Sequence, residues 1–138
     1  MRDARTALVT GLYTQLSAAT TTPVHARMPK SSALQYPYIQ IGDIYDEENG
    51  TKDSFMYDYD VLINIVHKDL SSLTPFYSDI DAVKGTINNN VPFALPAPFR
   101  ILESTLTSSS TTEFESADGS IINVCAVRVL FKVAQDAV

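Results

Sequence analysis

A long strand is predicted between Phe55 and Lys68, where apolar and polar residues alternate. Successive side chains of a strand point to opposite faces, so residues two apart share a face. One of these faces is apolar or aromatic at every position: Phe55, Tyr57, Tyr59, Val61, Ile63 and Ile65. The other face is mixed and carries Asp58, Asp60, Asn64 and Lys68. The pattern predicts a sheet with one face on a hydrophobic core and a second face that is half solvated or covered by another chain.

Two amphipathic helices are predicted from apolar residues spaced three and four apart. The first spans Asp3 to Ala18, and its stripe is Ala4, Ala7, Leu8, Gly11, Leu12 and Leu16. The second begins at Thr74, which fits an N-cap followed by proline. Its stripe is Leu73, Phe76, Tyr77, Ile80, Val83 and Ile87. Asp79 and Asp81 come early in this helix, where the helix dipole favours acidic residues.

The remaining segments predict further strands and their connections. Strands are expected at Leu34 to Ile44, Arg100 to Thr107, Thr111 to Ser116 and Ile121 to Val133, with a short extended piece at Val24 to Ala26. Connections are expected at the acidic segment Asp43 to Ser54, the proline-rich segment Val91 to Pro98 and the Asp118-Gly119 turn. This order predicts an α+β fold in one domain, residues 1–138, with a mostly antiparallel sheet and two main helices packed on one face.

Composition and charge narrow the possible functions. A chain of 138 residues is long enough for one domain with a real core. The net charge is −6, and the ten Lys and Arg residues are scattered, which argues against a protein that grips the phosphate backbone of DNA. The longest apolar run, Val124 to Phe131, is interrupted by Arg128 and is too short for a membrane helix. The first residues do not resemble a secretory signal, so we expect folding in the cytoplasm.

Asp58 and Asp60 are the strongest candidates for chemistry, because two carboxylates on one strand face can hold a divalent metal. A metal-dependent hydrolase built on them would also need converging ligands, and the sequence offers only Glu103 or Glu115. The alternative is a ladder of surface charges. If the last strand pairs with Phe55 to Lys68, two basic residues on its even face would lie opposite the aspartates: Arg128 and Lys132.

The other reactive residue types favour structural roles. Cys125 lies on the odd, apolar face of the last strand and is expected to be a small buried hydrophobe. His25 and His67 have no ligand-type neighbours at metal-binding spacing, so we interpret both as ordinary polar residues. The chain has no nucleophile elbow, P-loop, dinucleotide motif or Cys/His cluster. We therefore expect no enzymatic activity and no cofactor or metal.

The order of elements resembles that of the tail completion or tail terminator proteins of long-tailed bacteriophages and gene transfer agents. The resemblance runs from Arg5 to Val133 and includes YPYIQIGD, the strand YDYDVLINIVHK and the closing hairpin FRILESTLT…FESADGSIINVCAVRVLFKV. Its most specific pieces are the Tyr-Pro-Tyr-Ile entry to the first long strand and the Asp-Gly turn before the last. The link from Val91 to Pro98 is longer than in that family.

The resemblance implies a structural protein of the virion, at the neck region of the tail and assembled in the host cytoplasm. Such proteins form a six-membered ring on the end of the tail tube, stop its polymerisation and dock onto the head connector. The implied partners are therefore further copies of the chain, the tail tube protein and the connector or stopper protein, with no membrane. DNA would pass through the lumen without specific binding, and an acidic ring would keep it from sticking.

The acidic segment Asp43 to Ser54 is the predicted contact with a neighbouring subunit or the tube. The candidate interface residues are Asp43, Tyr45, Asp46, Glu47, Glu48, Asn49, Lys52, Asp58 and Asp60. Three alternatives stay open at this point. They are a neck adaptor, stopper or other minor tail protein, a small cytosolic metal-dependent hydrolase, and a monomeric binding module.

Overall fold

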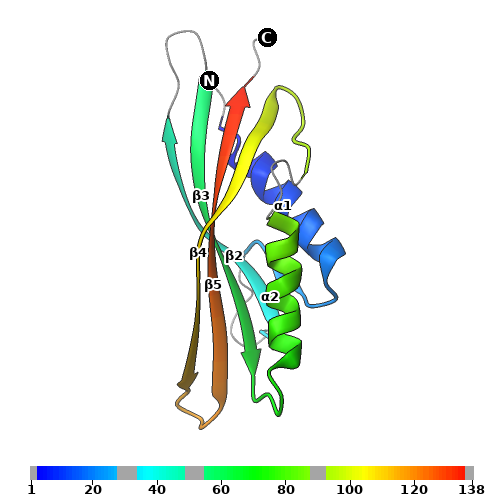
Figure 1. Ribbon diagram of the computed structural model, residues 1–138, viewed down its shortest axis with the longest axis vertical. Helices are drawn as coiled ribbons and strands as arrows, with labels where there is room; N and C mark the ends of the chain where they lie inside the picture. The colour runs from blue at the N-terminus through cyan, green and yellow to red at the C-terminus, as the bar shows by residue number, and fades with distance from the viewer. Residues whose placement is uncertain (1–2, 28–33, 49–54, 88–92, 136–138) are drawn as a thin grey trace.

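Both helices of this protein lie on the same side of one twisted sheet (Figure 1). The computed structural model describes residues 3–27, 34–48, 55–87 and 93–135. Along the chain these form α1 (Arg5–Ala19), β1 (Val24–His25), β2 (Tyr38–Glu48), β3 (Phe55–Lys68), α2 (Thr74–Ile87), β4 (Phe99–Glu115) and β5 (Ile121–Gln135). The predicted α+β class, with a mostly antiparallel sheet and two helices on one face, is confirmed.

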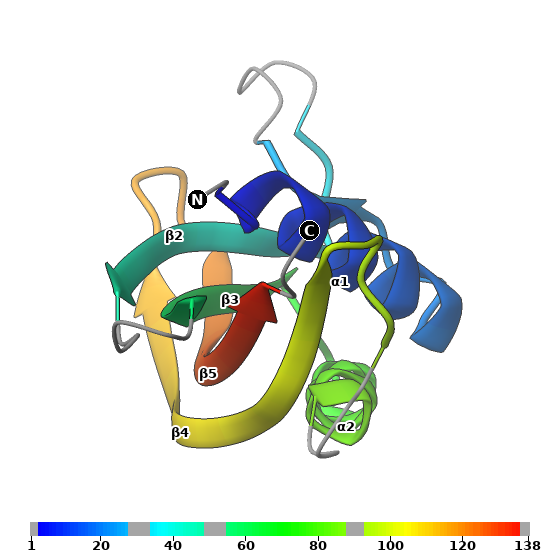
Figure 2. The same cartoon turned by 90° about the horizontal axis from the view of Figure 1, so that it is seen from above.

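The strand order is β1-β2-β3-β5-β4, so β3 and β5 are the central strands. They pair antiparallel from Phe55↔Gln135 to Lys68↔Ile122. The short strand β1 runs parallel to β2, and all other pairs are antiparallel. Seen from above, β2 and β4 flank the central strands, and α2 points along the length of the molecule (Figure 2). No helix among the described residues has the length and apolar character needed to cross a membrane.

The core lies between the helices and the face of the sheet that the alternation predicts. Tyr59, Val61, Ile63 and Ile65 are buried on β3, and Cys125 is buried on β5 with every second residue after it, as far as Val133. The stripe of α1 is buried at Leu8, Leu12 and Leu16, and that of α2 at Phe76, Ile80, Val83 and Ile87. The stripe predicted for α2 was wrong at its first turn, because Leu73 and Tyr77 are exposed. Cys125 is a buried small hydrophobe, as predicted.

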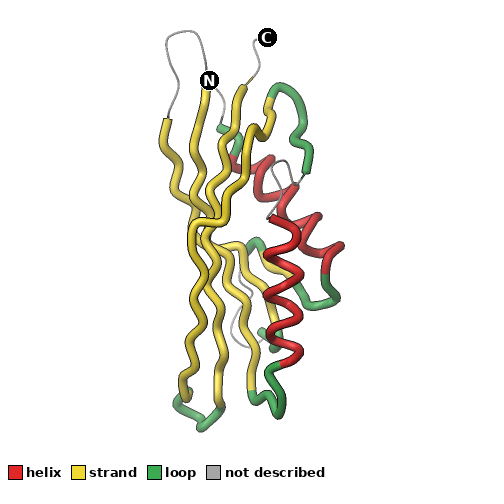
Figure 3. The backbone as a smooth tube through the Cα atoms, viewed as in Figure 1, coloured by secondary structure: helices red, strands yellow, loops and turns green. Residues whose placement is uncertain are grey.

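Two strands depart from their predicted bounds. Strand β2 begins at Tyr38 and not at Leu34, and β4 joins two strands that were predicted separately. Strand β2 continues through the acidic residues to Glu48, so the prediction of a loop from Asp43 was wrong. A bulge between Ile41 and Ile44 absorbs one extra residue, which keeps Ile44 opposite Val61 and extends the ladder with β3. Strand β4 runs unbroken through Ser108–Ser110, because β5 offers it a partner over that whole stretch. The β4–β5 hairpin extends past the N-terminal end of α2 (Figure 3).

The close approach of α1 to the proline-rich link depends on Gly11. We expect Gly11→Ala to lower the free energy of unfolding by about 1–3 kcal/mol, because the new Cβ would lie 2.4 Å from Cε2 of Phe93. This clash outweighs the better helix propensity of alanine, about 1 kcal/mol. The matched control is Gly85→Ala in α2, where the Cβ meets no described atom within 4 Å. That variant should gain about 0.5–1 kcal/mol in chemical unfolding, and equal shifts in both variants would contradict the packing argument.

Candidate subunit interface

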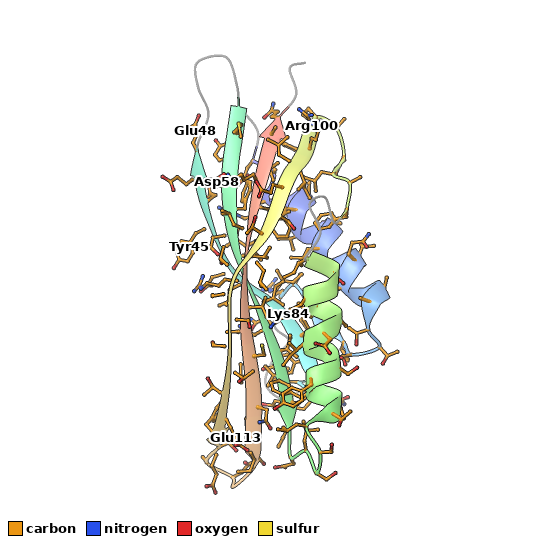
Figure 4. The ribbon with its side chains drawn as sticks, viewed as in Figure 1. Tyr45, Glu48, Asp58, Lys84, Arg100 and Glu113 are labelled. Carbon is orange, nitrogen blue, oxygen red and sulfur yellow. The ribbon has the colours of Figure 1, made fainter. Side chains whose placement is uncertain are left out.

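Strand β2 has a free edge along most of its length. β1 pairs with it only at Ile39 and Gln40, so Ile41–Glu48 has β3 on one side and no described strand on the other. This free edge carries acidic and aromatic side chains. Tyr45 is 65% exposed, and Asp46, Glu47 and Glu48 are exposed as well. Figure 4 shows Tyr45 projecting from the sheet, with Glu48 and Asp58 nearer the upper end.

The face of the sheet opposite the helices, here called the outer face, carries a row of charges across four strands. In this row Glu47 lies opposite Asp58, Asp58 opposite Lys132, and Lys132 opposite Glu103. On the same face, two residues further along β3, Asp60 Oδ1 lies 3.7 Å from Arg128 Nη1. The predicted position opposite a basic residue is therefore confirmed for Asp58, which faces Lys132. It was wrong for Asp60, which faces Leu130 and forms its ion pair diagonally with Arg128.

This geometry gives little support to the alternative of a metal-dependent hydrolase. Glu103 is separated from Asp58 by Lys132, and Glu115 lies at the far end of the sheet, opposite Ile121. Among the described residues no group of three or more His, Cys, Asp or Glu side chains is placed to hold a metal ion. The charged row sits beside a shallow hollow of about 490 Å³ lined by Tyr45, Asp46, Glu47, Asp58, Asp60 and Leu130. This arrangement suits charge pairing with another protein surface.

Asp46 points to the helix side of the sheet and ties the acidic edge to α1. Its Oδ1 accepts a hydrogen bond from the Arg5 guanidinium. Nearby, the Tyr59 hydroxyl accepts from the Ala4 amide at 3.0 Å and donates to Asp3 Oδ1 at 3.0 Å. These two hydrogen bonds of a buried tyrosine therefore fix the start of α1 to β3. Because Tyr59 is fully buried, its environment raises its pKa to about 12.

This raised pKa predicts a stability loss at alkaline pH that depends on Tyr59. The folded protein holds the phenolic proton more tightly than the unfolded chain, in which tyrosine has a pKa of about 10. The stabilisation is complete below about pH 10 and is lost as the pH rises towards 12. Chemical unfolding should show a smaller alkaline loss for Tyr59→Phe than for the wild type. The exposed control Tyr13→Phe should retain the wild-type slope, and identical slopes in all three proteins would refute the assignment.

The opposite edge of the sheet is formed by β4, which has β5 as its strand neighbour on one side alone among the described residues. From Thr107 to Glu115 every side chain is exposed. The part Ser104–Thr112 contains no charged residue and no proline. Natural edge strands are normally protected by lysine, proline, strong bulges or covering segments, because an open row of backbone donors and acceptors pairs with other chains. β4 has two register shifts, at Ile101/Glu103 and Leu106/Ser108, but little other protection.

The lower part of the outer face is apolar, in contrast to the charged upper part. Tyr38, Val66 and Ile122 form a small second core there, with Leu34 and Val124 packed against it. Beside them lies a hollow of about 460 Å³ whose walls include Tyr36 and Phe114, with Lys68 and Asp118 also lining it. Lys68 Nζ lies 5.3 Å from the centre of the Tyr36 ring and 3.8 Å from Asp118 Oδ2. The predicted mixed face is thus divided into a polar half and an apolar half.

A buried polar cluster joins the α1–β1 connection, β3 and α2. His67 Nε2 lies 2.7 Å from Asp79 Oδ2, and both side chains are buried. The same carboxylate accepts hydrogen bonds from the hydroxyls of Thr20, at 2.8 Å, and Thr22, at 2.7 Å. The interpretation of Asp79 as an acid placed for the helix dipole was therefore wrong: it is an internal acceptor. His67 is not an ordinary surface residue, and the cluster fixes three separate segments to one another.

The sequence already contained a signal for this cluster. His67 continues the odd, core-facing positions of β3, and Asp79 falls on the buried stripe of α2 between Phe76 and Val83. A polar residue on each of two core-facing patterns indicates that the two meet inside the protein. The threonines could not have been identified in the same way, because they lie in an irregular connection.

The structure brings most of the predicted interface residues together at one end of the sheet. Asp43, Tyr45, Asp46, Glu47 and Glu48 lie on β2, and Asp58 and Asp60 lie on the adjacent part of β3. They do not form a single face, because Asp46 points to the helix side, whereas Tyr45 and Glu47 pair with the outer-face positions of β3. Asn49 and Lys52 lie outside the described residues. The free edge of β4 was not among the predicted interface residues.

Comparison with known proteins identifies the fold. No protein-family model matches the sequence, and no curated protein matches it. Among solved structures, the chain is similar to a chain in the virion of a native gene transfer agent (GTA) particle, with a TM-score of 0.76 and 17% sequence identity. The similarity covers 97% of this chain and 99% of that chain. The whole chain therefore has the fold of a protein that is part of a virion.

Proposed function

We propose that this protein is a structural component of a phage or gene transfer agent virion, which caps the end of the tail tube as a ring. In this role it stops polymerisation of the tube and forms the tail side of the head–tail joint. Its partners are further copies of itself, the tube protein and the connector or stopper protein. The observation that supports the proposal most strongly is the near-complete structural similarity to a chain of a gene transfer agent virion.

The surface of the molecule suits assembly. Among the described residues, two edges of the sheet have no further strand beside them, and the outer face has a charged half and an apolar half. Protein interfaces commonly combine apolar and polar surface. The net charge of −6 also suits a ring through which DNA slides, because like charges do not attract.

Particle imaging tests this proposal directly. Gold-labelled antibody against the protein should bind one end of isolated tails, and the purified protein should form rings in negatively stained images. Added to polymerising tube protein, it should shorten the tubes, whereas a buffer control should not. Label along the whole tail, or on heads that lack tails, would contradict a tail-capping role, and the latter would favour a neck adaptor.

A further inference from the structure

We propose that β4 of one copy pairs antiparallel with the free Ile41–Glu48 edge of β2 in the next copy, so that the sheets continue from subunit to subunit. This inference rests on the proposed ring and specifies its subunit contact. Backbone hydrogen bonds between the two edges would supply much of the contact, as in other cases where a strand is added to an open sheet.

The topology of the sheet favours this pairing. From β2 through β3 and β5 to β4, each strand is antiparallel to its neighbour, so β4 runs opposite to β2. Rotating a second copy about an axis parallel to the strands leaves the direction of every strand unchanged. Placing its β2 beside β4 therefore continues the antiparallel alternation without a break. The contact joins two different edges, so it repeats head to tail and closes into a ring if the rotation closes.

The free edge of β2 and the first half of β4 match in length and lie at the same height along the strand direction. Across the four strands, Glu48 is in the same row as Ile101, Tyr45 in the same row as Thr105, and Ile41 in the same row as Ser109. The eight free residues of β2 thus lie level with the first half of β4. In this part of β4, Glu103, Thr105, Thr107 and Ser108 are exposed. No bulky or charged residue lies between Ser104 and Ser109 except Leu106.

Charge favours the pairing of β4 with β2 over the pairing of two β2 edges. The β2 edge carries no basic residue and four acidic ones, Asp43, Asp46, Glu47 and Glu48, whereas the upper half of β4 carries one residue of each sign, Arg100 and Glu103. Glu103 lies in the same row as Glu47, so a stagger between copies would separate these like charges. Arg100 is exposed and lies at the same upper end of the molecule as Glu48 (Figure 4). Head-to-tail pairing brings Arg100 close to the acidic edge of the neighbour. Pairing of two β2 edges would instead oppose like charges.

Engineered disulfides test the contact. Tyr45 and Thr105 lie in one row on opposite edges, three strand spacings or about 14 Å apart, too far for a bond within one copy. In the variant Tyr45→Cys/Thr105→Cys, mild oxidation should convert most monomers into a ladder of covalent multimers that ends at the size of the ring. Two further variants, Tyr45→Cys/Glu103→Cys and Tyr45→Cys/Ser108→Cys, test pairings in which neighbouring copies are shifted along the strand direction. The native Cys125 does not interfere, because it is buried, and burial raises the pKa of its thiol.

The controls separate this contact from other arrangements. Tyr45→Cys/Tyr77→Cys, with the second cysteine on the exposed face of α2, should stay monomeric on a reducing-agent-free gel. A covalent dimer of Thr105→Cys alone would show two β4 edges paired about a two-fold axis and would overturn the proposal. Rings that form without a disulfide in any of the three β2–β4 combinations would also overturn it, but would leave the proposed function intact.

A second pair of variants needs no oxidation. Thr105→Glu/Ser108→Glu places two charged side chains on exposed positions of β4, where they would face the acidic β2 edge of the neighbour, and should shift the protein from ring to monomer in light scattering. Ser17→Glu/Ala18→Glu adds the same charge to exposed positions of α1 and should leave the ring unchanged. Rings in both variants would contradict strand pairing. A wild-type chain that is monomeric at every concentration and on tail tubes would count against both the pairing and the proposed function.

Discussion

Replacing Phe131 with alanine is expected to lower the free energy of unfolding by about 3–5 kcal/mol, the largest loss we predict for this protein. Phe131 is fully buried on β5, lies opposite Tyr59 on β3, and has its ring centre 6.1 Å from that of Phe93. It therefore fills the space between the central strands and the proline-rich link. Removing the ring leaves a cavity at a place where three separate segments meet and cannot easily close together.

The matched control for this prediction is Phe114→Ala. Phe114 is the same residue type on the adjacent strand, but its side chain is 48% exposed. Its removal should change the free energy of unfolding by about 0.5 kcal/mol. Denaturant titrations at one pH and protein concentration would compare the two. Similar losses in both variants would mean that the interior around Phe131 is not packed as the structure shows it.

Replacing Asp79 with alanine is expected to cost about 3 kcal/mol, because it removes the shared acceptor of a buried cluster. The hydroxyls of Thr20 and Thr22 and the Nε2 atom of His67 would lose their common partner where little water can replace it. Asp79→Asn should lose less than Asp79→Ala, because the amide has nearly the same volume and its oxygen can still accept a hydrogen bond. Thermal or denaturant unfolding of the purified variants measures both effects.

Asp81→Ala is the control for the cluster, since Asp81 lies two residues further along α2 and is exposed. It should change the stability by no more than about 0.5 kcal/mol. Because the cluster lies on the helix side and away from both free edges, Asp79→Asn should still assemble if it folds. A stable Asp79→Ala protein would show that the cluster is dispensable and that packing alone holds the α1–β1 connection against α2.

Only part of the candidate interface could be predicted from the sequence. The acidic residues from Asp43 to Glu48 stand out by composition, and the even positions of β3 mark Asp58 and Asp60 as neighbours of that segment. The sequence could not show that the acidic segment is strand, because acidic residues have low strand propensity and pairing with β3 overrides it. It also could not show that β4 is an edge, since edge position depends on the strand order and not on any residue in the strand.

Local patterns along the chain establish which residues face the core. Alternation with period two in β3 and β5, and spacing of three and four in α1 and α2, identify most of the buried side chains, because burial of apolar surface is the dominant stabilising term. The tertiary structure decided what these local patterns cannot contain. It set the strand order that leaves β2 and β4 open, and it brought His67 and Asp79 together. It also separated the polar and apolar halves of the outer face. These features depend on contacts between distant segments, and at short range the chain indicates only that His67 and Asp79 each face the core.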